Sequence, residues 1–216
     1  MSIGNRRGGI RIRWALIFPI LPLLTVLLGS AVLGELRAQE PETFLVRSPT
    51  MHTGEMMPRD YTPDGRNLSP PLTWTGLPER TRQIAVLCQD HGVGFPPPWV
   101  HWIIYNIPGT AEGLPEGIPI NPGDPMPAEI EGAVQGNNGW GLPVYRGPAP
   151  PVGNVHHYDF AVYALDEELD LPPGLDREEL LEAIEGHVIG RGNMVPIYER
   201  QPMNAPEEEE DEIDFE

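Results

Sequence analysis

The sequence contains no lysine and only one cysteine in 216 residues. All 14 basic residues are arginines, and they stand against 32 acidic residues, so the formal net charge is −18. Beyond Arg37, nine arginines face 31 acids, which leaves −22. Phosphate backbones and anionic lipid surfaces attract basic proteins. The shortage of positive charge therefore argues against nucleic acid as a partner and against general adhesion to anionic membranes. Cys88 has no second cysteine, so no intrachain disulfide forms and the core must supply the stability.

The motifs of common hydrolases and zinc enzymes are also missing. There is no Gly-x-Ser-x-Gly sequence, and Ser69 precedes two prolines rather than standing on a nucleophile elbow. No pair of histidines has the His-x-x-x-His spacing that is typical of zinc sites. Catalysis by Asp90, His101 and His156, or metal binding by them, is therefore the least favoured interpretation. We expect a protein that is not an enzyme and that needs no metal or cofactor.

The two ends of the chain differ from its middle. No charged residue occurs from Trp14 to Gly34, and four arginines precede this run. This layout predicts that residues 1–40 are either a cleaved secretory signal peptide or an uncleaved membrane anchor, and that the protein is exported across the cytoplasmic membrane into the periplasm or beyond. At the other end, residues 201–216 are mostly acidic, which predicts a disordered, solvated tail.

Between these ends, residues 44–200 are long enough for one compact domain. Prolines and glycines interrupt the chain so often that long helices are excluded. The pattern of β-branched and aromatic residues predicts strands at 83–88, 100–106 and 158–165, with weaker candidates at 44–46 and 197–198. One helix is expected at 176–185, with Asp176 as its N-cap and Gly186 at its end. The fold class is therefore mainly β, a β-sandwich with one or two small peripheral helices.

The segment 147–158 combines a stiff turn with polar side chains. Three prolines and two glycines precede His156, His157 and Tyr158. Because side chains alternate along a strand, His156 and Tyr158 point to one face and His157 to the other. The segment indicates either a held binding site or a hairpin loop with surface histidines.

Three separated stretches together resemble the phosphatidylethanolamine-binding protein family, in its bacterial Raf-kinase-inhibitor-like branch. The first, residues 61–74, is similar to the family pattern Y-T-x-D-G-x-N-x-S-P-P-L-x-W. The second consists of Asp90 followed by residues 101–108, similar to H-W-x-x-x-N-I-P, and the third is residues 145–158, similar to Y-x-G-P-x-P-P-x-G-x-x-H-R-Y. The resemblance covers residues 48–200 and implies a Greek-key β-sandwich.

The resemblance also implies a small, non-catalytic anion pocket that takes phosphate or phospholipid head groups. Carried over residue by residue, its ligand-binding residues are Asp90, His101, Gly147, Pro148, His156 and Tyr158. This chain departs from the family pattern in two ways. The second aspartate of the D-P-D-A-P motif is missing after Asp90, and His157 stands where the family often has arginine. Taken alone, His101 fits a structural histidine beside Trp102 better than a ligand-binding residue, but together with His156, Asp90 and the Gly-Pro turn in the family order the binding interpretation is favoured.

Two functions from different classes follow. The first is an exported binding protein for a phosphate-like anion, with possible anchoring through residues 14–34. The alternative is an inhibitor or regulator of a protease or another envelope protein, with the proline-rich loop 95–99 as the surface for a protein partner.

Overall fold

The computed structural model describes residues 40–94, 96–121 and 124–202. The predictions of a signal peptide or anchor at 1–40 and of a disordered tail at 201–216 fall almost entirely outside these residues, so they stay predictions. Within the described ranges, none of the helices combines the length and the apolar character needed to cross a bilayer.

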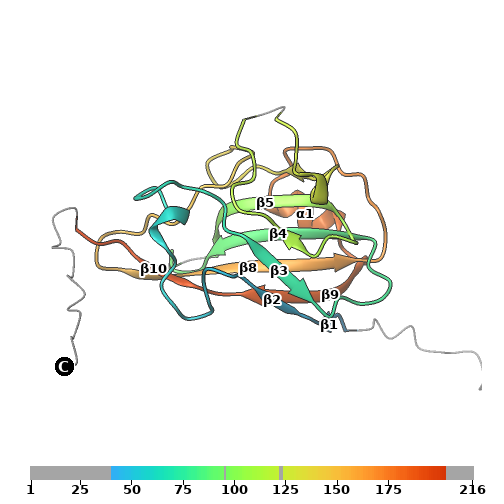
Figure 1. Cartoon of the computed structure of the whole chain (residues 1–216), viewed down its shortest axis with the longest axis horizontal. Coiled ribbons are helices and arrows are strands. Elements are labelled where there is room, and N and C mark those ends of the chain that lie inside the picture. The colour runs from blue at the N-terminus through green and yellow to red at the C-terminus, as the bar shows by residue number, and fades with distance from the viewer. Residues whose placement is uncertain (1–39, 95, 122–123, 203–216) are drawn as a thin grey trace, which may run out of the picture. The chain divides into compact units, whose positions relative to one another are not determined.

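The described chain forms two β-sheets (Figure 1). The larger sheet has seven strands in the order β1-β9-β8-β4-β5-β7, with β10 beside β8. The smaller sheet has the order β2-β3-β6. The strands of the larger sheet are β1 (Glu42–Thr43), β4 (Gln83–Asp90), β5 (Trp99–Pro108), β7 (Val134–Gln135), β8 (Val155–Leu165), β9 (Val188–Met194) and β10 (Ile197–Glu199). Those of the smaller sheet are β2 (Leu45–Arg47), β3 (Leu72–Thr75) and β6 (Gly113–Leu114).

Four strands of the larger sheet make a Greek key. β4, β5 and β7 are antiparallel neighbours, and β8 returns through a long connection to pair antiparallel with β4. The spatial order β8-β4-β5-β7 is the one that defines this motif. The mainly β fold expected from the pattern of prolines and strands is confirmed, and so is the sandwich that the family resemblance implied.

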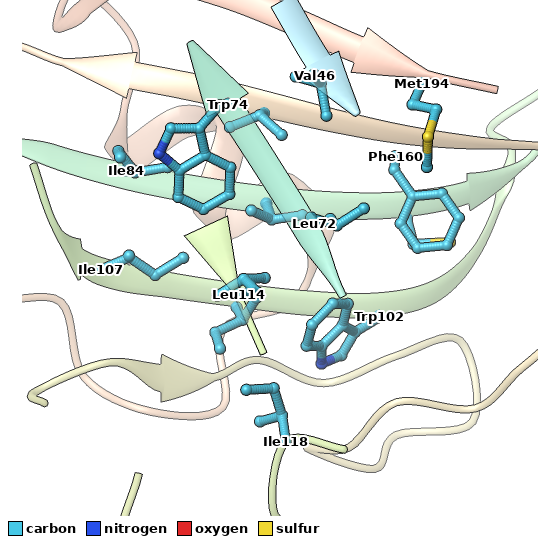
Figure 2. Packing of buried hydrophobic residues seen from close by; sticks show 14 of the residues in the cluster. Val46, Leu72, Trp74, Ile84, Trp102, Ile107, Leu114, Ile118, Phe160 and Met194 are labelled. Atoms are coloured by element: carbon cyan, nitrogen blue, oxygen red, sulfur yellow. The ribbon is translucent and has the colours of Figure 1, made fainter. Parts of the chain in front are cut away.

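The larger sheet is covered on both faces, and this explains the composition of its central strand. All eight residues of β4 are buried. Ile84, Val86 and Cys88 face the main core, which the smaller sheet closes with residues such as Leu72 and Trp74 (Figure 2). The alternate residues of β4 face a second core. A strand buried on both sides needs apolar residues at nearly every position, so β4 shows no polar alternation.

The second core lies under the one α-helix of the described residues, α1 (Arg177–Ala183), which contributes Leu180. Asp176 caps this helix through a capping box with Glu179, as the N-cap prediction requires. The helix is shorter than the predicted 176–185 because Ile184 already forms its C-cap and Gly186 has a φ of 85°. Two single-turn 3₁₀ helices, η1 (Arg59–Tyr61) and η2 (Ala128–Ile130), complete the described elements.

Candidate functional site

The end of β4 and the beginnings of β5 and β8 meet at one end of the larger sheet. Asp90, the last residue of β4, is paired with Trp99 of β5 on one side and with Tyr158 of β8 on the other. Antiparallel pairing therefore brings two distant predicted stretches to the same place. The predicted residues Asp90, His101, His156 and Tyr158 gather here, and we call them the histidine cluster.

The shortest polar contact of the cluster joins His156 to Asp90. The Nδ1–H of His156 donates to Oδ2 of Asp90 at 2.7 Å, and both side chains are largely buried. The other carboxylate oxygen accepts a hydrogen bond from the backbone N–H of Gly92 at 2.6 Å. A side chain on Gly92 would collide with the His156 ring, since its Cβ would lie 2.5 Å from Cγ. The glycine thus lets the turn after β4 close over the pair.

His101 reaches the cluster through a β-bulge. The pairing of β4 with β5 shifts by one residue between Cys88 and Gln89, so His101 is the extra residue on β5. A bulge redirects the side chain next to it. The His101 ring accordingly meets the Tyr158 ring edge to face, with centroids 5.2 Å apart. Its Nδ1–H donates to the carbonyl oxygen of Arg146 at 2.6 Å.

Burial sets the protonation of two cluster members. His101 is 4% exposed, and this burial lowers the pKa of its imidazole, although the Arg146 carbonyl works in the opposite direction. Burial also raises the pKa of the Tyr158 phenol, and the nearby Asp90 carboxylate raises it further. Tyr158 is therefore a neutral hydroxyl, and His101 is a neutral ring with Nδ1 protonated.

The predicted residues Gly147 and Pro148 are buried and directly follow Arg146, whose carbonyl oxygen accepts from His101. The N–H of Gly147 donates to Oδ1 of Asn67 at 2.9 Å, and Gly147 packs against the backbone of Tyr61. These contacts fix the segment whose preceding carbonyl, that of Arg146, orients His101. His157 is exposed on the other face of β8, as the alternation predicts.

Sequence reasoning missed the side chains that border the cluster. Trp140 packs edge to face against His101 and against Trp99, with centroids 5.3 Å apart in both cases. The guanidinium of Arg146 lies over the Trp140 ring at 4.4 Å. In the sequence, the run Asn137–Gly141 is typical of an ordinary turn. No sequence pattern therefore predicted that Trp140 packs against His101. In the loop 95–99, the predicted partner surface, Trp99 is 39% exposed, and Phe95 lies outside the described residues.

A pocket at the cluster stays a prediction. Four cavities formed by the described residues are not lined by Asp90, His101, His156 or Tyr158. The Tyr158 ring lies between the two imidazoles, edge to face with His101 and stacked with His156 at centroid distances of 5.2 and 6.5 Å. Among the described residues, no group of three or more histidine, cysteine, aspartate and glutamate side chains is arranged to hold a metal ion.

The buried, neutral state of His101 predicts a pH-dependent stability. Between the lowered folded pKa and the unfolded value of 6.5, the unfolded chain binds more protons, so stability falls as the pH drops through this window. The change His101→Asn keeps a donor for the Arg146 carbonyl and removes the titration. We expect the wild type to lose stability relative to this variant, by at most about 1.4 kcal/mol per pH unit. Urea unfolding from pH 7.5 to 5 measures it, and His157→Asn on the exposed face is the control. A constant difference between wild type and His101→Asn would contradict the prediction.

The comparisons with known proteins agree with the fold. Residues 47–199 match the family model described as phosphatidylethanolamine-binding protein. This match covers well over half of the chain, which therefore belongs to the phosphatidylethanolamine-binding protein family. The resemblance drawn from three short stretches is confirmed.

Relatives and solved structures extend this match. A UPF0098 protein of Methanothermobacter thermautotrophicus is 45% identical over 144 residues, which cover 67% of this chain and 91% of that protein. A UPF0098 protein of Pyrococcus horikoshii is 39% identical and covers 86% and 90% of the two chains. The crystal structure of E. coli YbcL, described as a new member of the mammalian family, has a TM-score of 0.66 and 32% identity, over 73% of this chain and 99% of that one. The crystal structure of a homologue from Chlamydia trachomatis has a TM-score of 0.64 and 31% identity. The match covers 74% of this chain and 99% of that one.

Proposed function

We propose that this protein is a non-catalytic binding protein whose histidine cluster receives a small phosphate-like anion, such as phosphate or a phospholipid head group. The observation that carries the proposal is the hydrogen bond of 2.7 Å between the largely buried side chains of His156 and Asp90, with Tyr158 beside the His156 ring. Membership of the phosphatidylethanolamine-binding protein family supports the same ligand class.

The hydrogen bonds of the two imidazoles define how an anion would be held. Both Nδ1 atoms already donate, to Asp90 and to the Arg146 carbonyl, so each ring has only Nε2 left for a ligand. In a neutral ring Nε2 is an acceptor, and in a protonated ring it is a donor. An anion therefore favours the protonated ring, and binding takes up a proton. Ordering of the rings by Asp90 and by the buried Gly147–Pro148 segment lowers the entropy lost on binding.

This coupling predicts that anion affinity rises as the pH falls. Sulfate is the suitable probe because its own charge is constant between pH 5 and 8. We expect an affinity gain of up to about tenfold per pH unit while binding protonates His101, whose burial lowers the pKa of its imidazole, and no further gain once that ring is protonated without the anion. Titration calorimetry with sulfate, phosphate and phosphoethanolamine measures it.

The matched variants for this experiment are two adjacent histidines. His156→Ala should abolish the heat of binding, whereas His157→Ala, on the exposed face, should retain it. Equal binding by wild type and His156→Ala would contradict the proposal.

Export belongs to the same proposal and is supported by the arginines and the uncharged run that precede the domain. We propose a location outside the cytoplasmic membrane, with residues 14–34 as signal or anchor. N-terminal sequencing of protein from the membrane fraction separates the two, and recovery from the cytoplasm alone would contradict both.

A regulatory role through a protein partner is the second candidate, favoured by the exposed Trp99 and the exposed prolines beside it. A pull-down in which Trp99→Ser captures the same proteins as the wild type would contradict it.

A further inference from the structure

We propose a second binding site, an apolar groove next to the histidine cluster that takes a small amphiphilic monoanion of fatty-acid size. The groove has a volume of about 550 Å³. Its lining comes from three separate segments of the chain and includes Pro63, Asn67, Ile120, Leu142, Pro143 and Arg146. We call this cavity the Arg146 groove.

The walls of the groove are apolar and open to solvent. Ile120 is 59% exposed and Leu142 is 46% exposed, although both are large aliphatic side chains. Two prolines, Pro63 and Pro143, line the groove with them. Exposed apolar side chains grouped around a concavity are typical of binding sites, because a ligand that covers them removes apolar surface from water.

The charge of the groove selects the sign of its ligand. Among the described residues that line it, Arg146 is the only charged one. The cavities near the other end of β4 differ, since Asp166 and Glu168 line both of them. The chain as a whole has a net charge of −18. In the Arg146 groove, by contrast, an anion would be attracted by Arg146 and repelled by no carboxylate among the described lining residues.

The side chain of Arg146 is positioned by a neighbouring aromatic ring. Its guanidinium lies over the Trp140 ring at 4.4 Å, and this stacking reduces the side-chain freedom lost on binding. Asn67 directs its amide oxygen to the N–H of Gly147 at 2.9 Å. That contact turns the amide nitrogen, a second donor, away from Gly147. One guanidinium and one amide suit a single carboxylate group.

The size of the groove favours a small molecule over a protein or a membrane. Small-ligand pockets measure roughly 300–1,000 Å³, whereas a stable protein interface buries about 800 Å² on each partner. The acidic chain also opposes an anionic bilayer. A free aliphatic carboxylate combines an apolar tail with one negative charge, so it matches both features of the groove.

The test is calorimetric titration of the full chain with octanoate, alongside octylammonium and octanol. We expect one octanoate site, with octylammonium and octanol binding at least about tenfold more weakly. Arg146→Gln should weaken octanoate about tenfold, and Arg146→Lys should recover part of the loss. Leu142→Asp should abolish binding. Arg80→Gln, far from the groove, and Leu45→Asp, at a position 45% exposed on β2, are the matched controls.

Every variant carries the same N-terminal segment, so nonspecific uptake of octanoate there cancels between them. Equal octanoate affinity in wild type, Arg146→Gln and Leu142→Asp would overturn the site. Equal affinity for octylammonium would overturn its selection of an anion. His156→Ala separates the two proposals, because it should abolish sulfate binding and leave octanoate binding unchanged. Loss of octanoate in this variant would overturn a separate groove site, while retained sulfate would overturn only the histidine cluster.

Discussion

Gly147→Ala is expected to lower the free energy of unfolding by about 3 kcal/mol, the upper range for overpacking a filled interior. A Cβ at this position would overlap the backbone carbonyl oxygen of Tyr61 and lie 2.9 Å from Cα of Thr62. Backbone atoms cannot rotate away as a side chain does. The Tyr61 carbonyl is further fixed because it accepts a hydrogen bond from the hydroxyl of buried Tyr145 at 2.7 Å. Urea unfolding followed by tryptophan fluorescence measures the loss.

The control for this change is Gly153→Ala in the same proline-rich segment. Gly153 has a φ of 79°, and no heavy atom lies within 4 Å of its added Cβ. This variant should therefore lose only about 1 kcal/mol, the cost of a left-handed backbone at a residue with a side chain. If the two variants lost equal stability, close packing of Gly147 on the 61–62 backbone would not be what fixes the segment beside His101.

The second large effect is expected for Asp90→Ala, about 3 kcal/mol of stability together with loss of sulfate binding. The change leaves two donors without their acceptor, Nδ1–H of His156 and the N–H of Gly92. A buried donor that loses its partner costs about 1–3 kcal/mol, and most of the loss comes from the largely buried His156 ring because Gly92 is exposed. Binding is lost as well because nothing then orients the His156 ring. Chemical unfolding and calorimetry measure the two effects.

Asp90→Asn separates charge from shape in this experiment. Asparagine keeps one acceptor oxygen and the size of the side chain, so it should cost less stability than alanine. Because the amide oxygen can still accept from Nδ1–H of His156 and orient the ring, sulfate affinity should fall less than in Asp90→Ala. Asp60→Ala, with a side chain 54% exposed, should change stability by less than about 0.5 kcal/mol. An Asp90→Ala variant as stable as Asp60→Ala would show that the buried pair does not contribute to folding.

Much of the fold could be predicted because its signals are local. The apolar runs of β4, β5 and β8 bury two faces of one sheet, so composition alone identifies them as strands. The capping box of α1 likewise involves residues three apart, Asp176 and Glu179. The short strands β1, β6 and β7 have two residues each, and their formation depends on the partner strand rather than on their own residues. They were therefore not predicted.

In the candidate site, too, local sequence patterns predict some side-chain positions, while others depend on how the strands pair. Alternation along β8 correctly places His156 and Tyr158 on one face and His157 on the other. The position of His101 depends on a shift in the pairing of β4 with β5, and a register shift involves two strands at once. No pattern within residues 99–108 reveals it.

The amino-acid sequence by itself determined the family, the strands β4, β5 and β8 and the alternation of side chains, since each depends on residue types and spacings within a short stretch. Only the tertiary structure decided that Asp90 pairs with His156 rather than with His101, and that Arg146 stacks on Trp140 beside an apolar groove. Asp90 and His156 are 66 positions apart in the sequence. Such partners are chosen by strand register, bulges and loop packing, which arise when the whole domain closes around its core.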